Sequence, residues 1–346
     1  MSATRCGPSV CPVKAIVQDR YGPPDSLELR EIERPEPGDH EVLVRVHAAS
    51  VNAADWHVMR GDPYVARLMS PSVFGLRGPK RRVRGQDFAG RVEAVGTSVT
   101  RLRPGDEVFG DLGFDEGAYA EYACVPQDRV EPKPVNFTFE QAAALPLAGI
   151  TALTGLRDVA VVQAGQRVLI NGASGGVGTY AVQLAKHFGA EVTAVCSTRN
   201  VDLIASLGAD HIVDYTRENF TARGTRYDVV LDLVGNRTLA DLRAVLTPAG
   251  TLILSGGGVS NGGSALGPLA LMIRGQLLDA FVRQRIRLLN PKVTAENLAA
   301  LRELAESGKL APVIDRTYAL AEVPDAIRYL ENEHARAKVV ITVLAK

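Results

Sequence analysis

The feature that most constrains the fold of this chain is the stretch of residues 167–200. Residues 168–170 form a short apolar run typical of a buried parallel strand, and residues 172–178 form a glycine-rich turn that lets backbone approach a ligand closely. A helical period then ends before Gly189, and residues 191–196 have the pattern of a second strand. This order predicts the first unit of a dinucleotide-binding sheet, with pyrophosphate held on the free N–H groups of the helix N-terminus.

The end of the second strand indicates which dinucleotide is bound. An NAD site needs an acidic residue roughly 20 residues after the glycines, whereas a 2′-phosphate needs a cation and hydroxyl donors. Ser197, Thr198 and Arg199 stand at this place, and the first carboxylate after them is Asp202. We therefore expect NADPH rather than NADH. The alternative is that Arg199 only caps a loop.

Composition limits the classes of partner. The 346 residues are enough for two domains, and the 39 basic residues equal the 39 acidic ones, which gives no electrostatic case for nucleic acid or an anionic membrane. No apolar run reaches the length of a membrane span, and residues 1–12 read as a loose extension without the apolar core of a secretory signal. We expect a cytoplasmic protein with reduced thiols at Cys6, Cys11, Cys124 and Cys196.

In the first third of the chain, apolar residues recur with a period of two. Short strands without helices between them predict an antiparallel, barrel-like β domain. Candidate strands cover residues 14–17, 27–30, 41–46, 90–95, 106–109 and 119–125. Residues 59–84 are expected to form a long loop with Tyr64 and a basic cluster of Lys80, Arg81, Arg82 and Arg84, which we interpret as solvated.

Strands and helices alternate after Phe139. The predicted helices cover residues 140–145, 149–160, 201–207, 239–246, 266–285, 297–307 and 323–331, and the predicted strands after residue 200 cover residues 211–213, 228–234, 250–255, 285–289, 314–318 and 338–343. The last part of the chain has a sequence pattern like that of the first part, so we expect it to fold back onto the β domain. The nucleotide domain is then inserted between two parts of that domain.

Together these features resemble the medium-chain dehydrogenase/reductase superfamily, and within it the zinc-free quinone oxidoreductase group. The marks of the resemblance are the motifs at residues 50–55, 85–90, 104–108, 145–152 and 173–178. The resemblance implies an α/β fold, with a Rossmann-type doubly wound parallel sheet domain and a GroES-like β-barrel domain. We place the GroES-like catalytic domain at residues 1–130, completed by 293–346, and the NADP-binding domain at residues 131–292.

The same resemblance bears on metal. Zinc alcohol dehydrogenases have a Cys at the strand end where this chain has Asn52, and a Gly-His-Glu where it has Gly85, Gln86 and Asp87. Zinc needs Cys, His or carboxylate ligands in tetrahedral reach. A lone His57 beside a tryptophan is more often a pocket residue than a ligand, so we predict no metal.

A site without metal suits hydride transfer to a quinone or to an alkene conjugated to a carbonyl, because the charge spreads onto an oxygen. The resemblance places Asn52 at the catalytic site and Thr151 beside the nicotinamide, and we add His57 and Tyr64 as candidate polar contacts. The cofactor-binding candidates are Thr151, Ser174, Gly175, Gly176, Val177, Gly178, Ser197, Thr198, Arg199, Tyr215, Val234, Gly235, Ser255 and Gly256.

Other functions stay open at this point. An enoyl-thioester reductase or an alcohol dehydrogenase would use the same fold, and the basic loop would then meet a phosphate of the thioester carrier. A non-catalytic NADPH-binding redox sensor is the alternative from another class. Relatives in this superfamily commonly pair the edge strand across a twofold axis, so residues 285–289 predict a homodimer.

Overall fold

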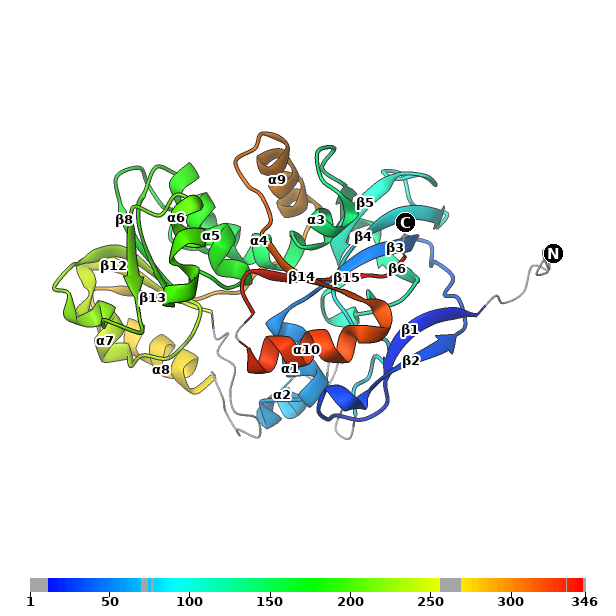
Figure 1. The fold of residues 1–346 in the computed structure, drawn as a ribbon, viewed down its shortest axis with the longest axis horizontal. Helices are drawn as coiled ribbons and strands as arrows, with labels where there is room; N and C mark the ends of the chain where they lie inside the picture. The colour runs from blue at the N-terminus through cyan, green and yellow to red at the C-terminus, as the bar shows by residue number, and fades with distance from the viewer. Residues whose placement is uncertain (1–11, 70–73, 76–77, 256–268, 334, 345–346) are drawn as a thin grey trace.

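The computed structural model describes residues 12–69, 74–75, 78–255, 269–333 and 335–344. Two large sheets lie side by side, one built mainly from the first and last parts of the chain and one from the middle (Figure 1). A separate pair of strands, β1 (Val13–Gln18) and β2 (Leu27–Ile32), lies near the N-terminus. The chain therefore leaves the first sheet, builds the second and returns.

The first sheet has seven strands. They are β3 (Glu41–Val51), β4 (Asp87–Val95), β5 (Glu107–Asp111), β6 (Tyr122–Pro126), β7 (Val130–Pro132), β14 (Ile314–Ala319) and β15 (Lys338–Thr342), in the order β14-β15-β3-β4-β5-β7, with β6 also paired to β3. The last strand, β15, runs antiparallel to β3, with Val340 opposite Ser50. This pairing confirms the expected return of the C-terminal part to the β domain.

The second sheet is parallel and has the strand order β10-β9-β8-β11-β12-β13. Its strands are β8 (Arg167–Asn171), β9 (Glu191–Cys196), β10 (His211–Asp214), β11 (Tyr227–Asp232), β12 (Leu246–Leu254) and β13 (Arg285–Leu288). The order reverses between β8 and β11, which is the doubly wound arrangement whose switch point binds dinucleotides. The Rossmann-type prediction is confirmed.

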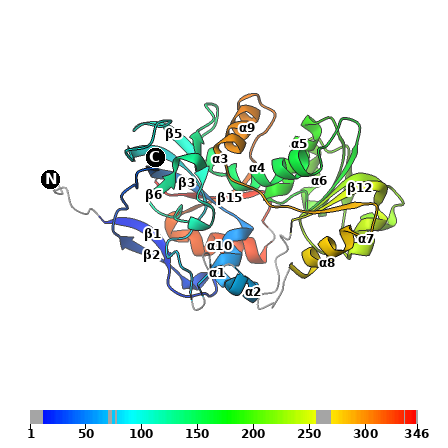
Figure 2. The ribbon, with the colours of Figure 1, turned by 180° about the vertical axis from the view of Figure 1, so that it is seen from behind.

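Helices cover both faces of the second sheet. The two views in Figures 1 and 2 place α5 (Gly176–His187) and α6 (Val201–Ser206) on one side, and α7 (Leu239–Ala244) and α8 (Leu269–Asp279) on the other. Alternate side chains of each strand enter different cores: Val168 and Ile170 pack with the α5 side, and Leu169 packs with the α7 side. Because successive side chains of a strand point to opposite faces, and both faces of this sheet are covered by helices, residues 168–170 are all apolar.

Three further helices join the two parts. They are α3 (Phe139–Ala143), α4 (Pro146–Leu153) and α9 (Ala295–Glu306). The apolar side chains of these three helices share one core with residues of both sheets, including Ala48 and Val340 of the first and Ile170 of the second. A fourth helix, α10 (Val323–Asn332), lies between β14 and β15 in the chain. The domain limits at residues 130 and 292 stay predictions.

Several predicted elements need correction. Residues 53–69, placed mostly in a loop, form α1 (Ala53–Arg60) and α2 (Tyr64–Met69). The predicted helix over residues 149–160 is α4 followed by a π-helical turn, Thr154–Val159, and the described helix α8 is shorter than residues 266–285. Propensity does not locate such ends because tertiary packing decides them.

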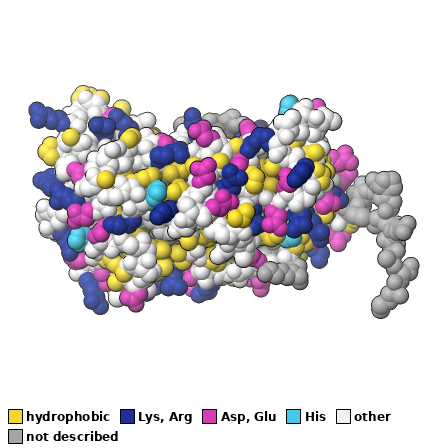
Figure 3. Space-filling view, turned by 90° about the horizontal axis from the view of Figure 1, so that it is seen from above, with side chains coloured by type: hydrophobic (Ala, Val, Ile, Leu, Met, Phe, Trp, Pro, Cys, Tyr) yellow, Lys and Arg dark blue, Asp and Glu magenta, His cyan; other side chains and the backbone are white. Residues whose placement is uncertain are grey.

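Surface charge agrees with the balanced composition. Acidic and basic side chains are interspersed over the face seen in Figure 3. Among the described helices, none is long and apolar enough to span a membrane.

Candidate functional site

The glycine turn lies between β8 and α5, as predicted. Gly172 has a φ of +89°, and a Cβ on Gly178 would overlap the backbone of Gly172 and Ala173, so these two glycines serve the turn and the helix–strand packing. Gly175 is different: its φ is −80°, and a Cβ there would come no nearer than 3.5 Å to the protein, at the Gly172 carbonyl oxygen. A side chain at Gly175 would therefore occupy space that the fold leaves open at the start of α5, where Val177 follows in the first turn.

The C-terminal segment contacts this turn from the β domain. The Ala337 backbone N–H donates to the Ser174 carbonyl oxygen at 2.8 Å. A Cβ on Gly176 would lie 3.2 Å from Cδ of Lys338, so that glycine faces the β domain. Ala337 itself has a φ of +58°, a left-handed conformation that costs a non-glycine residue about 1 kcal/mol or more.

The end of β9 holds the hydroxyl and cation predicted for a 2′-phosphate. Asn200 donates from Nδ2 to Oγ of Ser174 at 2.9 Å and to Oγ of Ser197 at 3.2 Å, which ties the glycine turn to this strand end. Arg199 donates from its guanidinium to the Glu333 carbonyl oxygen at 2.9 Å, at the C-terminal end of α10. That contact is the capping role given above as the alternative for Arg199.

An acidic residue that sequence analysis overlooked lies close by. Asp214, at the end of β10, accepts from Oγ1 of Thr198 at 2.5 Å and from Oγ1 of Thr216 at 2.7 Å. The Thr198 hydrogen bond is the largest cause that holds the pKa of Asp214 below its usual range. The sequence could have indicated it, because β10 neighbours β9 and its last residue reaches the same sheet edge.

The remaining cofactor candidates lie at the carboxyl ends of neighbouring strands. Val234 and Gly235 follow β11, and both backbone N–H groups donate to Oδ1 of Asp232, at 3.3 and 3.1 Å. Ser255 follows β12, and Tyr215 follows β10 with half of its surface exposed, 51%. Gly256 lies outside the described residues.

Asn52 sits at the end of β3, as the N-cap residue of α1, and is 8% exposed. Its Nδ2 donates to Oδ2 of Asp87 at 2.9 Å, and its Oδ1 accepts from Nζ of Lys338 at 2.6 Å. Sequence analysis missed Lys338, although an isolated lysine at the start of an apolar C-terminal strand is a signal for a buried partner.

Asp87 connects this amide to the nucleotide-binding side. It is fully buried, and its Oδ2 also accepts from Oγ of Ser50 at 2.8 Å. Its Oδ1 accepts from the backbone N–H of Leu147 at 2.9 Å, in the first turn of α4. The same helix carries Thr151, the predicted nicotinamide neighbour, which is 7% exposed and donates to the Leu147 carbonyl oxygen at 2.6 Å.

The other two catalytic candidates are placed differently. His57 lies on α1, where Nδ1 is 3.2 Å from the Asp62 carbonyl oxygen, and burial lowers its pKa. Because a carbonyl oxygen only accepts, Nδ1 carries the proton of the neutral ring and Nε2 is an acceptor. Tyr64 is 49% exposed on α2, with the guanidinium of Arg67 at 4.8 Å from its ring centroid.

The buried carboxyl group of Asp55 holds the backbone of Asn52 in place. Oδ2 of Asp55 accepts from the Asn52 backbone N–H at 2.7 Å and from the Tyr119 hydroxyl at 3.0 Å. Burial raises the pKa of Asp55 from 3.8 to about 6. Two hydrogen bonds to one carboxyl oxygen fix the start of α1 and, with it, the backbone of Asn52.

Three of the four basic residues in the loop cluster are paired with carboxylates. Arg84 is buried and pairs with the buried Glu116, which corrects the interpretation that the whole cluster is solvated. Arg81 pairs with Asp115 at 3.0 Å, and Arg82 pairs with Asp19. These carboxylates offset the local positive charge.

The positions that match the zinc ligands of zinc alcohol dehydrogenases hold polar side chains of another kind. Asn52 and Asp87 are joined by the Lys338 ammonium, whose Nζ is 3.3 Å from Oδ2 of Asp87. An ammonium at this distance repels a divalent cation. In the part of the chain that the structure describes, no three His, Cys, Asp or Glu side chains are grouped so as to hold a metal ion.

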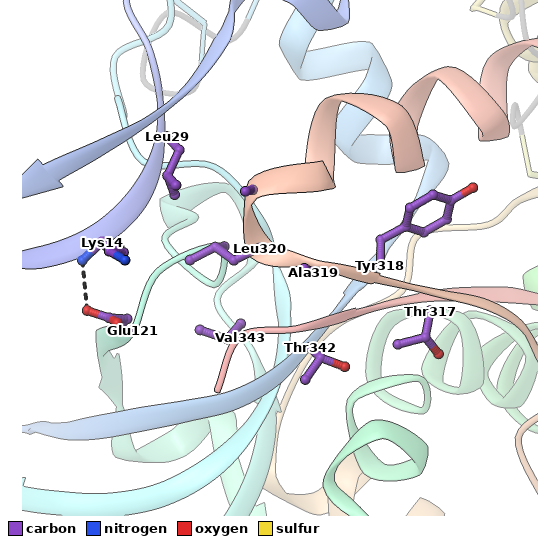
Figure 4. A pocket seen from close by; sticks show the side chains of 10 residues that line it. Lys14, Leu29, Glu121, Thr317, Tyr318, Ala319, Leu320, Thr342 and Val343 are labelled. Atoms are coloured by element: carbon purple, nitrogen blue, oxygen red, sulfur yellow. Dashed lines mark hydrogen bonds between the residues drawn. The ribbon is translucent and has the colours of Figure 1, made fainter. Parts of the chain in front are cut away.

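A cavity of about 390 Å³ lies elsewhere, on the β domain near β1, β14 and β15 (Figure 4). Leu29, Leu320 and Val343 give it an apolar lining, and at its rim Glu121 accepts from the Lys14 backbone N–H at 2.8 Å. None of the predicted site residues lines it.

Known proteins resemble both parts of the chain. Residues 38–135 match the model of the alcohol dehydrogenase GroES-like domain, and residues 207–341 match the model of a zinc-binding dehydrogenase family. The 2-methylene-furan-3-one reductase of Solanum lycopersicum is 36% identical over 95% of this chain and 79% of its own length. The chloroplastic NADPH-dependent alkenal/one oxidoreductase of Arabidopsis thaliana is 34% identical over the same shares.

A solved structure covers nearly the whole fold. The quinone oxidoreductase from Coxiella burnetii superposes with a TM-score of 0.83 at 33% identity, over 96% of this chain and 100% of that one.

Proposed function

Because this chain belongs to the medium-chain dehydrogenase/reductase superfamily, we propose that it is an NADPH-dependent oxidoreductase that reduces quinones or other α,β-unsaturated carbonyl compounds without zinc. The observation that carries the proposal is the junction between Asn52 and the glycine turn, where Lys338 donates to Asn52 and the neighbouring Ala337 donates to Ser174. The relatives named above act on a methylene-furanone, on alkenals and enones, and on quinones, and all three substrate classes present a conjugated carbonyl oxygen.

The residues of the site fit a dinucleotide. The open space at Gly175, the free N–H groups at the start of α5 and the carboxyl ends of β9, β11 and β12 form the crevice in which such folds hold pyrophosphate and nicotinamide. When bound, the reduced nicotinamide supplies a hydride. Thr151, on the helix capped by Asp87, borders this crevice in our assignment.

The protein's own groups then act on the substrate oxygen. Asn52 donates a hydrogen bond to that oxygen and stabilises the negative charge that develops there. His57, neutral and with Nδ1–H directed at Asp62, offers an acceptor rather than a donor in its present tautomer. The proton that completes the reduction comes from solvent or from the exposed Tyr64.

The cofactor preference is also part of the proposal. Ser197 and Arg199 supply a hydroxyl and a cation where a 2′-phosphate would lie. The Thr198 hydroxyl is donated to Asp214, and Arg217 offsets the charge of Asp214 with Nε at 3.4 Å from Oδ2. The Arabidopsis relative is named as NADPH-dependent. We therefore assign NADPH over NADH.

Two features support a homodimer. Strand β13 ends the order of the parallel sheet, and an edge strand needs a partner or a cover. Beside it, Ile273 and Leu277 are 48% and 66% exposed, one turn apart on α8, and Phe281, just after the helix, is 86% exposed. A cytoplasmic location stays a prediction, because the Arabidopsis relative is chloroplastic.

A substrate panel tests the function. The purified protein is assayed with 1,2-naphthoquinone, 2-cyclohexenone, an enoyl thioester and a simple secondary alcohol, each with both nicotinamide cofactors. We expect NADPH oxidation with the quinone and the enone. NADPH binding without turnover of any substrate would instead indicate the non-catalytic sensor.

A further inference from the structure

Lys338 is a buried cation whose ammonium group is surrounded by oxygen acceptors. Its side chain is 2% exposed at the first position of β15. Nζ lies 2.6 Å from Oδ1 of Asn52, 3.3 Å from Oδ2 of Asp87 and 3.4 Å from the Val51 carbonyl oxygen. An ammonium has three hydrogens and no acceptor, so these three oxygens satisfy it completely.

The two ends of the Asn52 amide face opposite charges. Its oxygen meets the Lys338 ammonium, and its nitrogen meets the Asp87 carboxylate. A flipped amide would direct N–H at the ammonium and its oxygen at the carboxylate, and both contacts are repulsive in a buried place. The charges therefore determine the amide orientation.

The amide consequently has one hydrogen left to offer. Nδ2 carries two hydrogens, one donated to Asp87, and the hydrogen bonds of the described residues include no acceptor for the other. The amide oxygen is covered by Lys338. The ammonium also draws electron density toward that oxygen, which strengthens the remaining N–H as a donor.

We propose that Lys338 is a positioning residue that restricts Asn52 to donating a hydrogen bond to the substrate, which favours carbonyl and quinone oxygens and prevents Asn52 from taking the proton of an alcohol. This inference rests on the proposed function. An alcohol donating hydride must lose its hydroxyl proton to an acceptor, and the covered oxygen of Asn52 supplies none. A carbonyl oxygen needs only the donor.

The stem of the same lysine extends this positioning toward the cofactor site. Cδ of Lys338 is the nearest protein atom to the place of a Cβ on Gly176, and Ala337 donates to Ser174 in the same turn. Asp87 in turn holds the first turn of α4 through Leu147. The amide and α4 are thus joined through the Lys338–Asp87 ion pair, and the glycine turn is joined to the same segment through the backbone of Ala337.

Substitution of the ammonium by an apolar chain of similar length tests the inference. Lys338→Met is compared with Lys186→Met, which breaks an ion pair with Asp210 on the surface of the nucleotide domain. A double variant, Asp87→Asn with Lys338→Met, removes both charges, so that neither is left buried without its partner if the single variant is unstable. For each protein, kcat/KM for 2-cyclohexenone and for 1,2-naphthoquinone, NADPH Kd and melting temperature are measured.

A positioning role predicts unequal losses. An enone accepts hydride less readily than a quinone and depends more on a hydrogen bond to its oxygen, so its kcat/KM should fall about 10- to 100-fold in Lys338→Met and in the double variant. The quinone kcat/KM should fall by less than about fivefold, and NADPH Kd should stay within about twofold. Lys186→Met should leave kcat/KM unchanged for both the enone and the quinone.

Equal losses for the two substrates, or an enone rate that does not change in the folded double variant, would overturn the inference and leave the proposed function standing. Wild-type protein that binds NADPH but reduces neither compound would overturn both.

Discussion

The backbone N–H of Ala337 donates to the carbonyl oxygen of Ser174 at 2.8 Å, which joins the last strand of the β domain to the glycine turn. The turn is therefore held from the side of Gly176, and its other side, at Gly175, faces open space. The two glycines consequently have different functions although they are adjacent in sequence.

Gly175→Val should abolish NADPH binding and leave the fold intact. The backbone at Gly175 is extended, and the nearest protein atom to a new Cβ is 3.5 Å away. The matched variant Gly178→Val should instead lower the free energy of unfolding by a few kcal/mol, because its Cβ overlaps backbone. Fluorescence titration with NADPH and thermal melting of both variants check this. Normal NADPH affinity in Gly175→Val would remove the pyrophosphate from this turn.

Arg199→Ala should weaken NADPH binding about 10- to 100-fold and leave NADH binding nearly unchanged, because only the 2′-phosphate uses a charge-assisted hydrogen bond. Arg223→Ala, which breaks a surface pair with Glu218, is the control. Dissociation constants for both cofactors are measured on each variant. Equal weakening of NADPH and NADH would show that Arg199 has a structural role, as in its contact with Glu333.

The purified protein should contain no stoichiometric zinc, and chelators should not lower its activity. Asn52 and Gln86 replace ligand types, and Lys338 places a positive charge beside Asp87. Elemental analysis and an assay after dialysis against a chelator check this. One zinc per chain, lost together with activity, is the result that would contradict it.

Leu277→Glu should convert a dimer into a monomer. A charge on the exposed apolar face of α8, next to the edge strand β13, would be buried unpaired in the proposed interface. Val135→Glu is the control, since that residue is also apolar and 85% exposed but lies before α3. Light scattering at micromolar concentration measures the mass, and a monomeric wild type would exclude the interface.

Asp55 should make the stability of the folded protein depend on pH. Its pKa is about 6 in the folded chain against 3.8 for an exposed carboxyl, so between these values the folded state keeps a proton that the unfolded state has lost. Raising the pH from about 4 to about 7 should therefore lower the free energy of unfolding of wild type relative to Asp55→Asn by on the order of 2 kcal/mol. Urea unfolding of both proteins at each pH measures the difference. A constant difference would contradict the shift.

Local patterns predicted much of this fold. The strand β9 has the predicted limits, and residues 168–170, apolar on both faces, identified the first strand of the parallel sheet. The limits of β12 and α8 were less accurate because packing against neighbours decides where pairing ends. Helix α1 was missed because only its contact with the β domain explains a helix of eight residues there.

The site was predictable only in part. Gly175 and Asn52 follow from motifs that are local in sequence, but Lys338 is 286 residues from Asn52, and nothing in a local window connects them. Asp214 was missed for the same reason: it ends a neighbouring strand, so its distance along the chain from the glycines does not indicate that it lies beside Thr198. Contacts between strands far apart in sequence were the part that the sequence left undetermined.

The return of β15 to β3 has a consequence for biosynthesis. A ribosome releases β3, the glycine turn and the whole parallel sheet before it releases Lys338, so the amide of Asn52 has no cation beside it until translation is nearly finished. A chain that stops short of β15 can form its nucleotide-binding sheet but leaves Asp87 without its buried counterion. Assembly of the site around Asn52 therefore depends on β15, and a chain without β15 leaves residues 48–51 of β3 unpaired on that side.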